Sequence, residues 1–300
     1  MMRRPGPRGF TLMEVLMVFA IISIFLSVLL PAILGAREAS RRTQCENNLK
    51  QIMLAIQNYG ETFQVFPPGV VNESGPIANQ DKGYHVSWAV QLLPYMEQSM
   101  LASSVDTGSS IYSPANWKVR STFISILSCP SDPGPAQGPS RVAQNSYAAV
   151  HSDVEVPIDA GNSGVFFLNS KLRYEGIPDG TSQTIFVGEK PRNDLDLGWV
   201  SGTRATLRNT GTPINSGDLL HSRTPVKMWG ADGRTLDGSP FIPDPKNPYL
   251  VGGFGSHHEH GANFGFGDGS VRFVSETVQR DVYRRLANRA DGEMISDGEF

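Results

Sequence analysis

The chain has 300 residues, a net charge of −3 and a pI near 6.1, so it lacks the basic character of nucleic-acid-binding proteins, and we expect no nucleic-acid partner. Its 31 glycines and 21 prolines, with only 18% charged residues, favour a loop-rich β head over a helical bundle. The composition and the patterns below predict an α+β fold, in which a long N-terminal helix packs on a β-rich head with short helices.

The N-terminal region combines a basic leader with a long apolar run. Residues 1–9 form the leader, which contains Arg3, Arg4 and Arg8 and ends at Gly9. Residues 15–36 carry no charge, and about 20 helical residues cover the roughly 30 Å of a bilayer core. We therefore expect a transmembrane span within residues 10–36. Because basic flanks stay cytoplasmic, the N-terminus is predicted to be inside and the head exported.

Two residues of this run are unusual for a plain membrane anchor. Glu14 would cost a few kcal/mol in lipid unless it has a partner. Pro31 lacks a backbone N–H donor, so it loosens the helix. An ordinary secretory signal would need a shorter apolar core and a small-residue cleavage site. A simple signal anchor remains an alternative, but it does not explain Gly9, Phe10 and Glu14 together.

The leader ending in Gly9, followed by Phe10-Thr11-Leu12 and Glu14, resembles the class III signal of type IV pilins and type II secretion pseudopilins. The resemblance implies that a prepilin peptidase cuts after Gly9 and methylates Phe10. It further implies that Glu14 pairs with the N-terminal amine of a neighbouring subunit, and Pro31 matches a proline of pilin helices. The implied partners are the peptidase, other pilin-like subunits and membrane lipid.

The helical pattern continues beyond the apolar run and changes character. Cys45, Leu49, Ile52 and Ile56 recur at one face of a 3.6-residue period. We therefore expect one helix over residues 10–59, with residues 37–60 as its amphipathic half and residues 61–300 as the head. Cys45 and Cys129 both lie in the exported part, where a disulfide is favoured and two buried thiols are the alternative.

The sequence of the head predicts several short helices and strands. Helices are expected over residues 87–101, broken at Pro94, over 117–123, and after an N-cap at Ser275, with Val278, Val282 and Leu286 on one face. Strands are expected over residues 124–127, 146–150, 164–168, 184–188 and 200–207, with a hairpin of 261–266 and 270–274 around Asp268-Gly269. Residues 60–83 and 209–248 are expected to be loops.

Five segments have a distinctive sequence, namely RRTQCENNLKQI, LLPYMEQ, CPSDP, IPDGTSQTIFVGE and HEHGANFGFGDGSVRF. Together they resemble the DUF1559 family of exported, pilin-like proteins. The family carries a histidine nine intervening residues before Asp-Gly, and here these are His258, Asp268 and Gly269. The biochemical role of the family is largely unassigned, so the resemblance implies an architecture and no activity.

The sequence of the head contains no complete set of metal-binding or catalytic residues. His258 and His260 would share a strand face and could bind a metal with Asp268, but a histidine before a hairpin more often bonds the local backbone or an Asp. Asp179, Glu189 and Asp268 could ligate Ca²⁺, although Asp-Gly pairs are also good turns. We therefore expect no metal, no cofactor and no enzymatic activity. The tryptophans are expected to lie in the core or at its edge rather than to line a groove for a carbohydrate or polymer, namely Trp88, Trp117, Trp199 and Trp229.

The expected function is that of a pilin-like or pseudopilin-like structural subunit in the inner membrane, with its head in the periplasm. It would assemble into a filament of the type II secretion or type IV pilus kind. The alternative is a membrane-anchored, exported binding module for a polymer, a glycan or a cation.

Overall fold

The computed structural model describes residues 12–138, 141–193, 195–216, 247–293 and 295. Contacts divide the chain into two units, residues 1–43 and residues 44–300. Helix α1 (Leu12–Phe63) contributes to both units, and the second unit adds a β-sheet and short helices. The mixed α+β class is confirmed, and α1 matches the helix predicted over residues 10–59 with four further residues at its end.

The first unit consists of the N-terminal part of α1. Its large apolar side chains that the structure describes between Leu12 and Ile33 are exposed, Phe19 to 65% and Phe25 to 63%. Among the described residues, no helix combines the length and the apolar character needed to cross a bilayer. The transmembrane span predicted over 10–36 is therefore not confirmed.

Three residues of the N-terminal motif have a limited description. Gly9 and Phe10 lie outside the described residues. Pro31 belongs to α1, but its side chain lies outside the described part. The predicted cleavage site is therefore known from the sequence alone.

The second unit is built on a five-stranded sheet in the order β5-β3-β4-β6-β7. Its strands are β3 (Tyr147–Ser152), β4 (Ile185–Glu189), β5 (Leu207–Asn209), β6 (Gly261–Phe266) and β7 (Val271–Ser275). All neighbours are antiparallel except β3 and β5. The predicted hairpin of β6 and β7 is confirmed, and Gly269 supplies the positive φ of 88° that its turn requires. Strands β1 (Val70–Val71) and β2 (Val86–Ser87) form a separate ribbon, and β1 lies in the segment 60–83 that was expected to be a loop.

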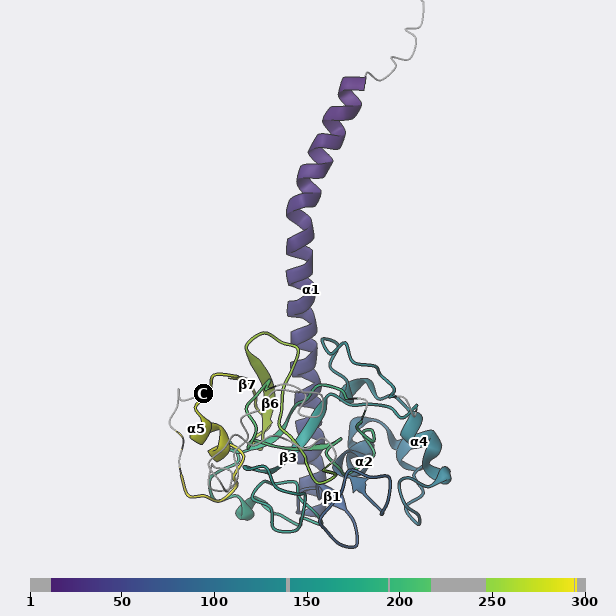
Figure 1. The fold of residues 1–300 in the computed structure, drawn as a ribbon, viewed down its shortest axis with the longest axis vertical. Helices are drawn as coiled ribbons and strands as arrows, with labels where there is room; N and C mark the ends of the chain where they lie inside the picture. Colours follow the sequence, from purple (N-terminus) through teal and green to yellow (C-terminus); the bar gives the residue numbers. More distant parts are fainter. Residues whose placement is uncertain (1–11, 139–140, 194, 217–246, 294, 296–300) are drawn as a thin grey trace, which may run out of the picture. The chain divides into compact units, whose positions relative to one another are not determined.

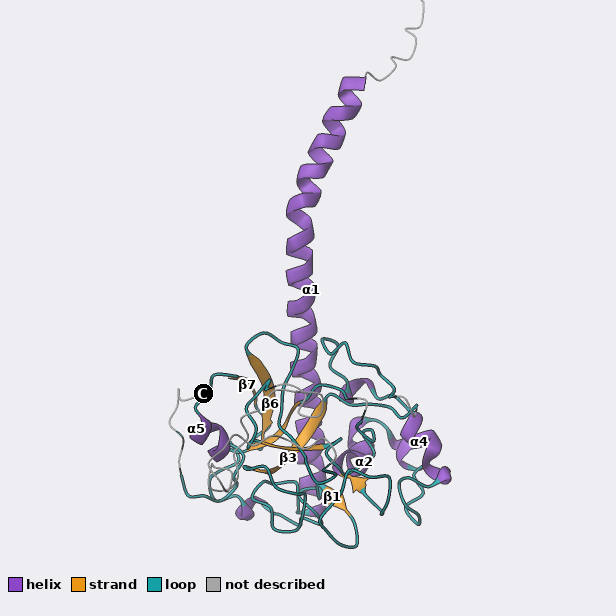
Figure 2. Cartoon of the chain, viewed as in Figure 1, coloured by secondary structure: helices purple, strands orange, loops and turns teal. Residues whose placement is uncertain are grey.

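Short helices surround the sheet. They are α2 (Trp88–Leu92), α3 (Ser99–Ala102), α4 (Trp117–Ser121) and α5 (Arg280–Arg285), together with the 3₁₀ turns η1 (Leu93–Met96), η2 (Pro114–Asn116), η3 (Ser125–Leu127) and η4 (Tyr174–Gly176). Figure 1 shows α5 on one side of the strands and α2 and α4 on the other. Loops make up much of this unit, as the composition predicts (Figure 2).

The sheet separates two buried clusters because alternate residues of a strand point to opposite faces. In β3, Tyr147 and Ala149 join the cluster that contains residues of α1, while Ala148 and Val150 join the other. The second cluster includes Tyr283 of α5 together with Val282 and Leu286. Both faces of the sheet are therefore covered, and the central strands β3 and β4 are buried along their full length.

The C-terminal part of α1 packs on the sheet through the predicted stripe. Cys45, Leu49, Ile52 and Ile56 are all fully buried. Next to them, Met53 lies over β6, where a Cβ added at Gly265 would come within 2.6 Å of its Cγ. The glycine therefore allows the helix to approach the strand closely.

Two predicted strands and part of a third are wrong. Residues 125–127 form η3, because Leu127 N–H donates to the Ile124 carbonyl in a local turn. Only the end of 200–207 is extended, since Thr206 N–H donates to Thr203 and folds the preceding residues into turns. Residues 164–168 form no named strand, because their backbone bonds go to different segments, including β3 and Gly69.

The N-cap predicted at Ser275 is also wrong. Ser275 is the last residue of β7, and its hydroxyl accepts from Thr277 N–H. Helix α5 begins later, with Gln279 as its N-cap. A serine hydroxyl at the end of a strand can accept a hydrogen bond either from a nearby turn or from the first turn of a following helix. In this structure Ser275 accepts the hydrogen bond of the turn.

Candidate functional site

Four side chains that can ligate a metal meet inside the second unit. Cys45 comes from α1, Cys129 from the turn after η3, Glu189 from the end of β4 and His258 from the turn before β6. All four are buried, and one ligand atom of each lies within 4.8 Å of the others. We call this group the Cys–His–Glu cluster.

The two cysteines of the cluster are joined in a disulfide, with their Cα atoms 4.9 Å apart. His258 Nε2 lies 3.8 Å from Cys129 Sγ and 3.4 Å from Glu189 Oε1. A disulfide, an imidazole and a carboxylate therefore share one small, water-excluding space. The bridge links α1 to the turn at Cys129.

Hydrogen bonds outside the cluster fix the positions of its members. The backbone N–H and the side-chain amide of Asn263 donate to the two carboxylate oxygens of Glu189, at 2.8 and 3.1 Å. Tyr147 Oη donates to the Cys45 carbonyl, and Arg192 donates to the Cys129 carbonyl. The backbone N–H of His258 donates to Ser256 Oγ. These contacts hold each segment without involving the sulfur atoms.

The metal partners predicted for His258 lie elsewhere. His260 has a positive φ of 66° and an exposed side chain that faces Glu276 at 3.7 Å. Asp268 accepts from Ser270 N–H in the hairpin turn. The prediction required a strand over 258–260, but β6 begins only at Gly261. Sequence reasoning named Glu189 only as a calcium candidate and missed its contact with His258, which depends on the register of β4 and β6.

The other calcium candidate also has a turn role. Asp179 accepts hydrogen bonds from the backbone N–H groups of Asp291 and Gly292, at 2.7 and 3.0 Å. Its carboxylate therefore connects the turn before β4 with the C-terminal segment. Asp179, Glu189 and Asp268 each bond different backbone groups, and the structure does not bring them together as a ligand set.

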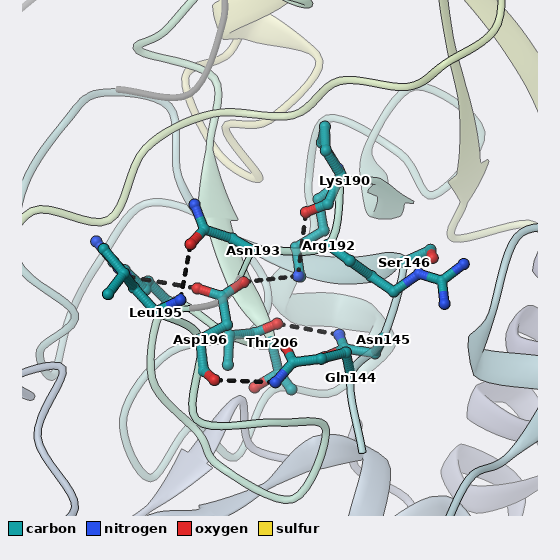
Figure 3. Close-up of polar contacts among 12 residues, drawn as sticks. Gln144, Asn145, Ser146, Lys190, Arg192, Asn193, Leu195, Asp196 and Thr206 are labelled. Carbon is teal, nitrogen blue, oxygen red and sulfur yellow. Dashed lines mark hydrogen bonds and ion pairs between the residues drawn. The ribbon is translucent and has the colours of Figure 1, made fainter. Parts of the chain in front are cut away.

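A second buried polar group surrounds Asp196, as Figure 3 shows. Lys190 Nζ lies 2.8 Å from Asp196 Oδ2, and two arginines, Arg208 and Arg204, lie at 3.4 and 3.5 Å. Gln144 donates to the Asp196 carbonyl. Burial opposes ionisation of Asp196, but the three cations hold its pKa below the usual value. Burial also lowers the pKa of Lys190, and the attraction of Asp196 offsets part of this effect.

A cavity of about 320 Å³ lies beside this polar group. Its walls include Arg192, Arg204, Arg208 and His257, together with the glycine-rich residues 252–255. The surface is concave and largely apolar, and its arginines also pair with Asp132 and Asp196, so the cavity suits a small solute with a polar group. No pattern in the sequence indicated this cavity, because its walls come from separate loops.

The tryptophans have mainly structural positions. Trp88 and Trp199 are fully buried, and their indole N–H groups donate to the carbonyls of Thr206 and Thr122. Trp117 is 44% exposed at the start of α4. Trp229 lies outside the described residues. The expectation of core positions is confirmed for Trp88 and Trp199.

Comparisons with known proteins agree with the two resemblances of the sequence. A family model described as protein of unknown function (DUF1559) matches residues 35–281. A model of the prokaryotic N-terminal methylation motif matches residues 4–30. No curated protein and no solved structure gives a significant match to the chain.

Proposed function

Since the chain belongs to the DUF1559 family and begins with a prokaryotic N-terminal methylation motif, we propose that it is a pilin-like structural subunit that is processed after Gly9. The motif at residues 4–30 is the observation that carries this proposal. A prepilin peptidase removes the leader and methylates Phe10, and the mature chain then begins two residues before the first residue of α1.

The exposed apolar side chains of α1 support assembly through this helix. Full burial of one large apolar side chain contributes about 1.5–3 kcal/mol, so covering the apolar residues between Leu12 and Ile33 is strongly favourable. Before assembly the cover is lipid of the inner membrane, with the leader in the cytoplasm. After assembly it is the helices of sister subunits in a filament of the type II secretion or type IV pilus kind.

Glu14 gives the assembly its specificity. In the mature chain the new N-terminal amine of Phe10 carries a positive charge close to the carboxylate of Glu14 in a neighbouring subunit. In apolar surroundings each charge alone is unfavourable, and pairing removes most of that cost. Correct stacking of subunits is therefore favoured over other helix contacts.

The disulfide supports an exported head. Disulfides persist in oxidising compartments such as the periplasm and are rare in the cytosol. The Cys45–Cys129 bridge lies in the second unit, which would be outside the cytoplasmic membrane in this arrangement.

The cavity favours a second function, that of an exported binding module. A volume of about 320 Å³ with arginine side chains in its walls can hold a small polar or anionic group, such as the end of a polymer or glycan. In this case the N-terminal helix would only anchor the module, and the processed protein would remain monomeric.

Two variants test the proposed function, and a third serves as a control. Gly9→Val should leave the leader uncut, which a shift of the full-length chain on an immunoblot detects. Glu14→Val should be cut normally but should be lost from high-molecular-weight assemblies after in vivo crosslinking. Glu38→Val, which removes an exposed carboxylate paired with Arg41 in the same helix, should be processed and assembled normally. Normal processing of the Gly9 variant would refute the proposal, whereas an unmodified chain that is processed but remains monomeric would favour the binding module.

A further inference from the structure

We propose that the Cys–His–Glu cluster becomes a closed Zn²⁺ site when its disulfide is reduced. The ligands are the thiolates of Cys45 and Cys129, the imidazole Nε2 of His258 and a carboxylate oxygen of Glu189. This site lies in the head and is independent of the processing and assembly proposed above.

The geometry of the cluster matches a single metal centre. Zinc binds four ligands in a tetrahedron, with about 2.3 Å to sulfur and about 2.0–2.2 Å to nitrogen or oxygen, so ligand atoms lie roughly 3–4 Å apart. Here one atom from each of the four residues lies within 4.8 Å of the others. His258 Nε2 already lies 3.4 Å from Glu189 Oε1 and 3.8 Å from Cys129 Sγ. Only the two sulfur atoms must separate.

The chemical nature of the four ligands determines which metal ion the site prefers. Two thiolates with an imidazole favour Zn²⁺ over Mg²⁺ and Ca²⁺, which require mostly oxygen ligands. All four residues are buried, so the site has no open position for a substrate or a catalytic water. The metal would therefore have a structural role.

The redox step needs a dithiol reductant. A thiolate of the reductant attacks one sulfur of the bridge and forms a mixed disulfide, and its second thiolate then releases the protein. Cys45 and Cys129 end as thiols and the reductant ends as a disulfide, which balances two electrons and two protons. Binding of Zn²⁺ releases the two thiol protons, because the ligands are thiolates.

Hydrogen bonds from neighbouring residues keep the four ligands in place after the disulfide is reduced. Asn263 fixes Glu189 through two hydrogen bonds, and Tyr147 and Arg192 hold the carbonyls of Cys45 and Cys129. Such outer contacts orient ligands in metal sites. With two thiolates, a carboxylate and Zn²⁺ the centre has a net charge of −1, and Arg192, which pairs with Asp132, donates to the carbonyl of Cys129 beside it. The metal then replaces the covalent link between α1 and the turn at Cys129.

Metal titration of the full-length chain in detergent tests the proposal. The chain is reduced with a phosphine, which avoids thiol competitors, and ZnCl₂ is added before desalting and metal analysis. We expect one Zn²⁺ per reduced chain and none on the oxidised chain. Substitution of the metal by Co²⁺ should give the absorption of a tetrahedral site with thiolate ligands.

Variants separate this site from surface histidines. His258→Gln and Glu189→Gln should each weaken Zn²⁺ binding by at least about tenfold. His260→Gln, which alters an exposed histidine two residues away, should bind as the unmodified chain does. Circular dichroism of the same samples reports the fold. The proposal is overturned if the reduced chain binds no more zinc than the oxidised chain, if His258→Gln binds as tightly as His260→Gln, or if reduction unfolds the head and zinc does not restore it.

Discussion

Glu189 Oε1 lies 3.4 Å from His258 Nε2, and both side chains are almost completely buried. The contact joins the end of β4 to the turn before β6. Asn263 donates two further hydrogen bonds to the same carboxylate. The carboxylate of Glu189, at the end of β4, therefore contacts both the turn before β6 and β6 itself.

Removal of this acceptor should destabilise the head. Glu189→Ala leaves the amide groups of Asn263 buried without their partner, which costs about 1–3 kcal/mol. Urea unfolding followed by circular dichroism measures the change. Glu276→Ala is the matched control, because Glu276 faces the exposed His260 and its loss should cost less than about 1 kcal/mol. Equal stabilities of the two variants would contradict the assigned role of Glu189.

A larger effect is expected at Asp196. Asp196→Asn leaves Lys190 and the nearby arginines buried without their countercharge, and breaking a buried ion pair costs about 3–5 kcal/mol. Glu293→Gln removes the partner of Arg285 at the surface and should change the free energy of unfolding by less than about 0.5 kcal/mol. Thermal or urea unfolding distinguishes the two, and a change below about 1 kcal/mol at Asp196 would count against a structural ion network.

The stability of the head should fall in mild acid because of His151. Complete burial lowers the pKa of His151 from 6.5 to about 4. Below pH 6.5 this histidine is protonated in the unfolded chain, whereas in the folded chain it stays neutral until about pH 4. The free energy of unfolding therefore decreases as the pH falls from 6.5 to about 4. The full effect is about 3 kcal/mol for this group. His85, whose pKa is also lowered to about 4 by burial, acts in the same direction.

Unfolding free energies between pH 7 and pH 4 measure this dependence. His151→Gln should flatten the slope, and His260→Gln, at an exposed position, should leave it unchanged. A wild-type chain whose stability is constant over this range would show that neither buried histidine resists protonation.

Sequence patterns predicted the parts of the fold that depend on local periodicity. The buried face of α1 and the hairpin around Gly269 follow from residue spacing and turn chemistry, and the structure contains both. The two cysteines were expected to pair because they lie in a segment that is predicted to be exported, and the structure joins them. In each case the signal lies in a few residues whose preferences do not depend on distant partners.

The candidate site could not be predicted in the same way. The approach of Glu189 to His258 depends on the register of β4 against β6, which no single segment encodes. The cavity beside Arg208 depends on loops that meet only in the folded chain. The histidine motif indicated the correct turn, but its spacing suggested Asp268 as a partner, whereas Asp268 stabilises the hairpin turn.

The identity of the first residue of the mature chain decides whether the leader is removed after Gly9. Mass spectrometry of the N-terminal peptide from membrane fractions identifies both the cleavage site and its modification. Our account predicts a peptide that begins at Phe10 and carries one additional methyl group on its amine. A mature chain that retains residues 1–9, or that begins at any other position, would contradict it.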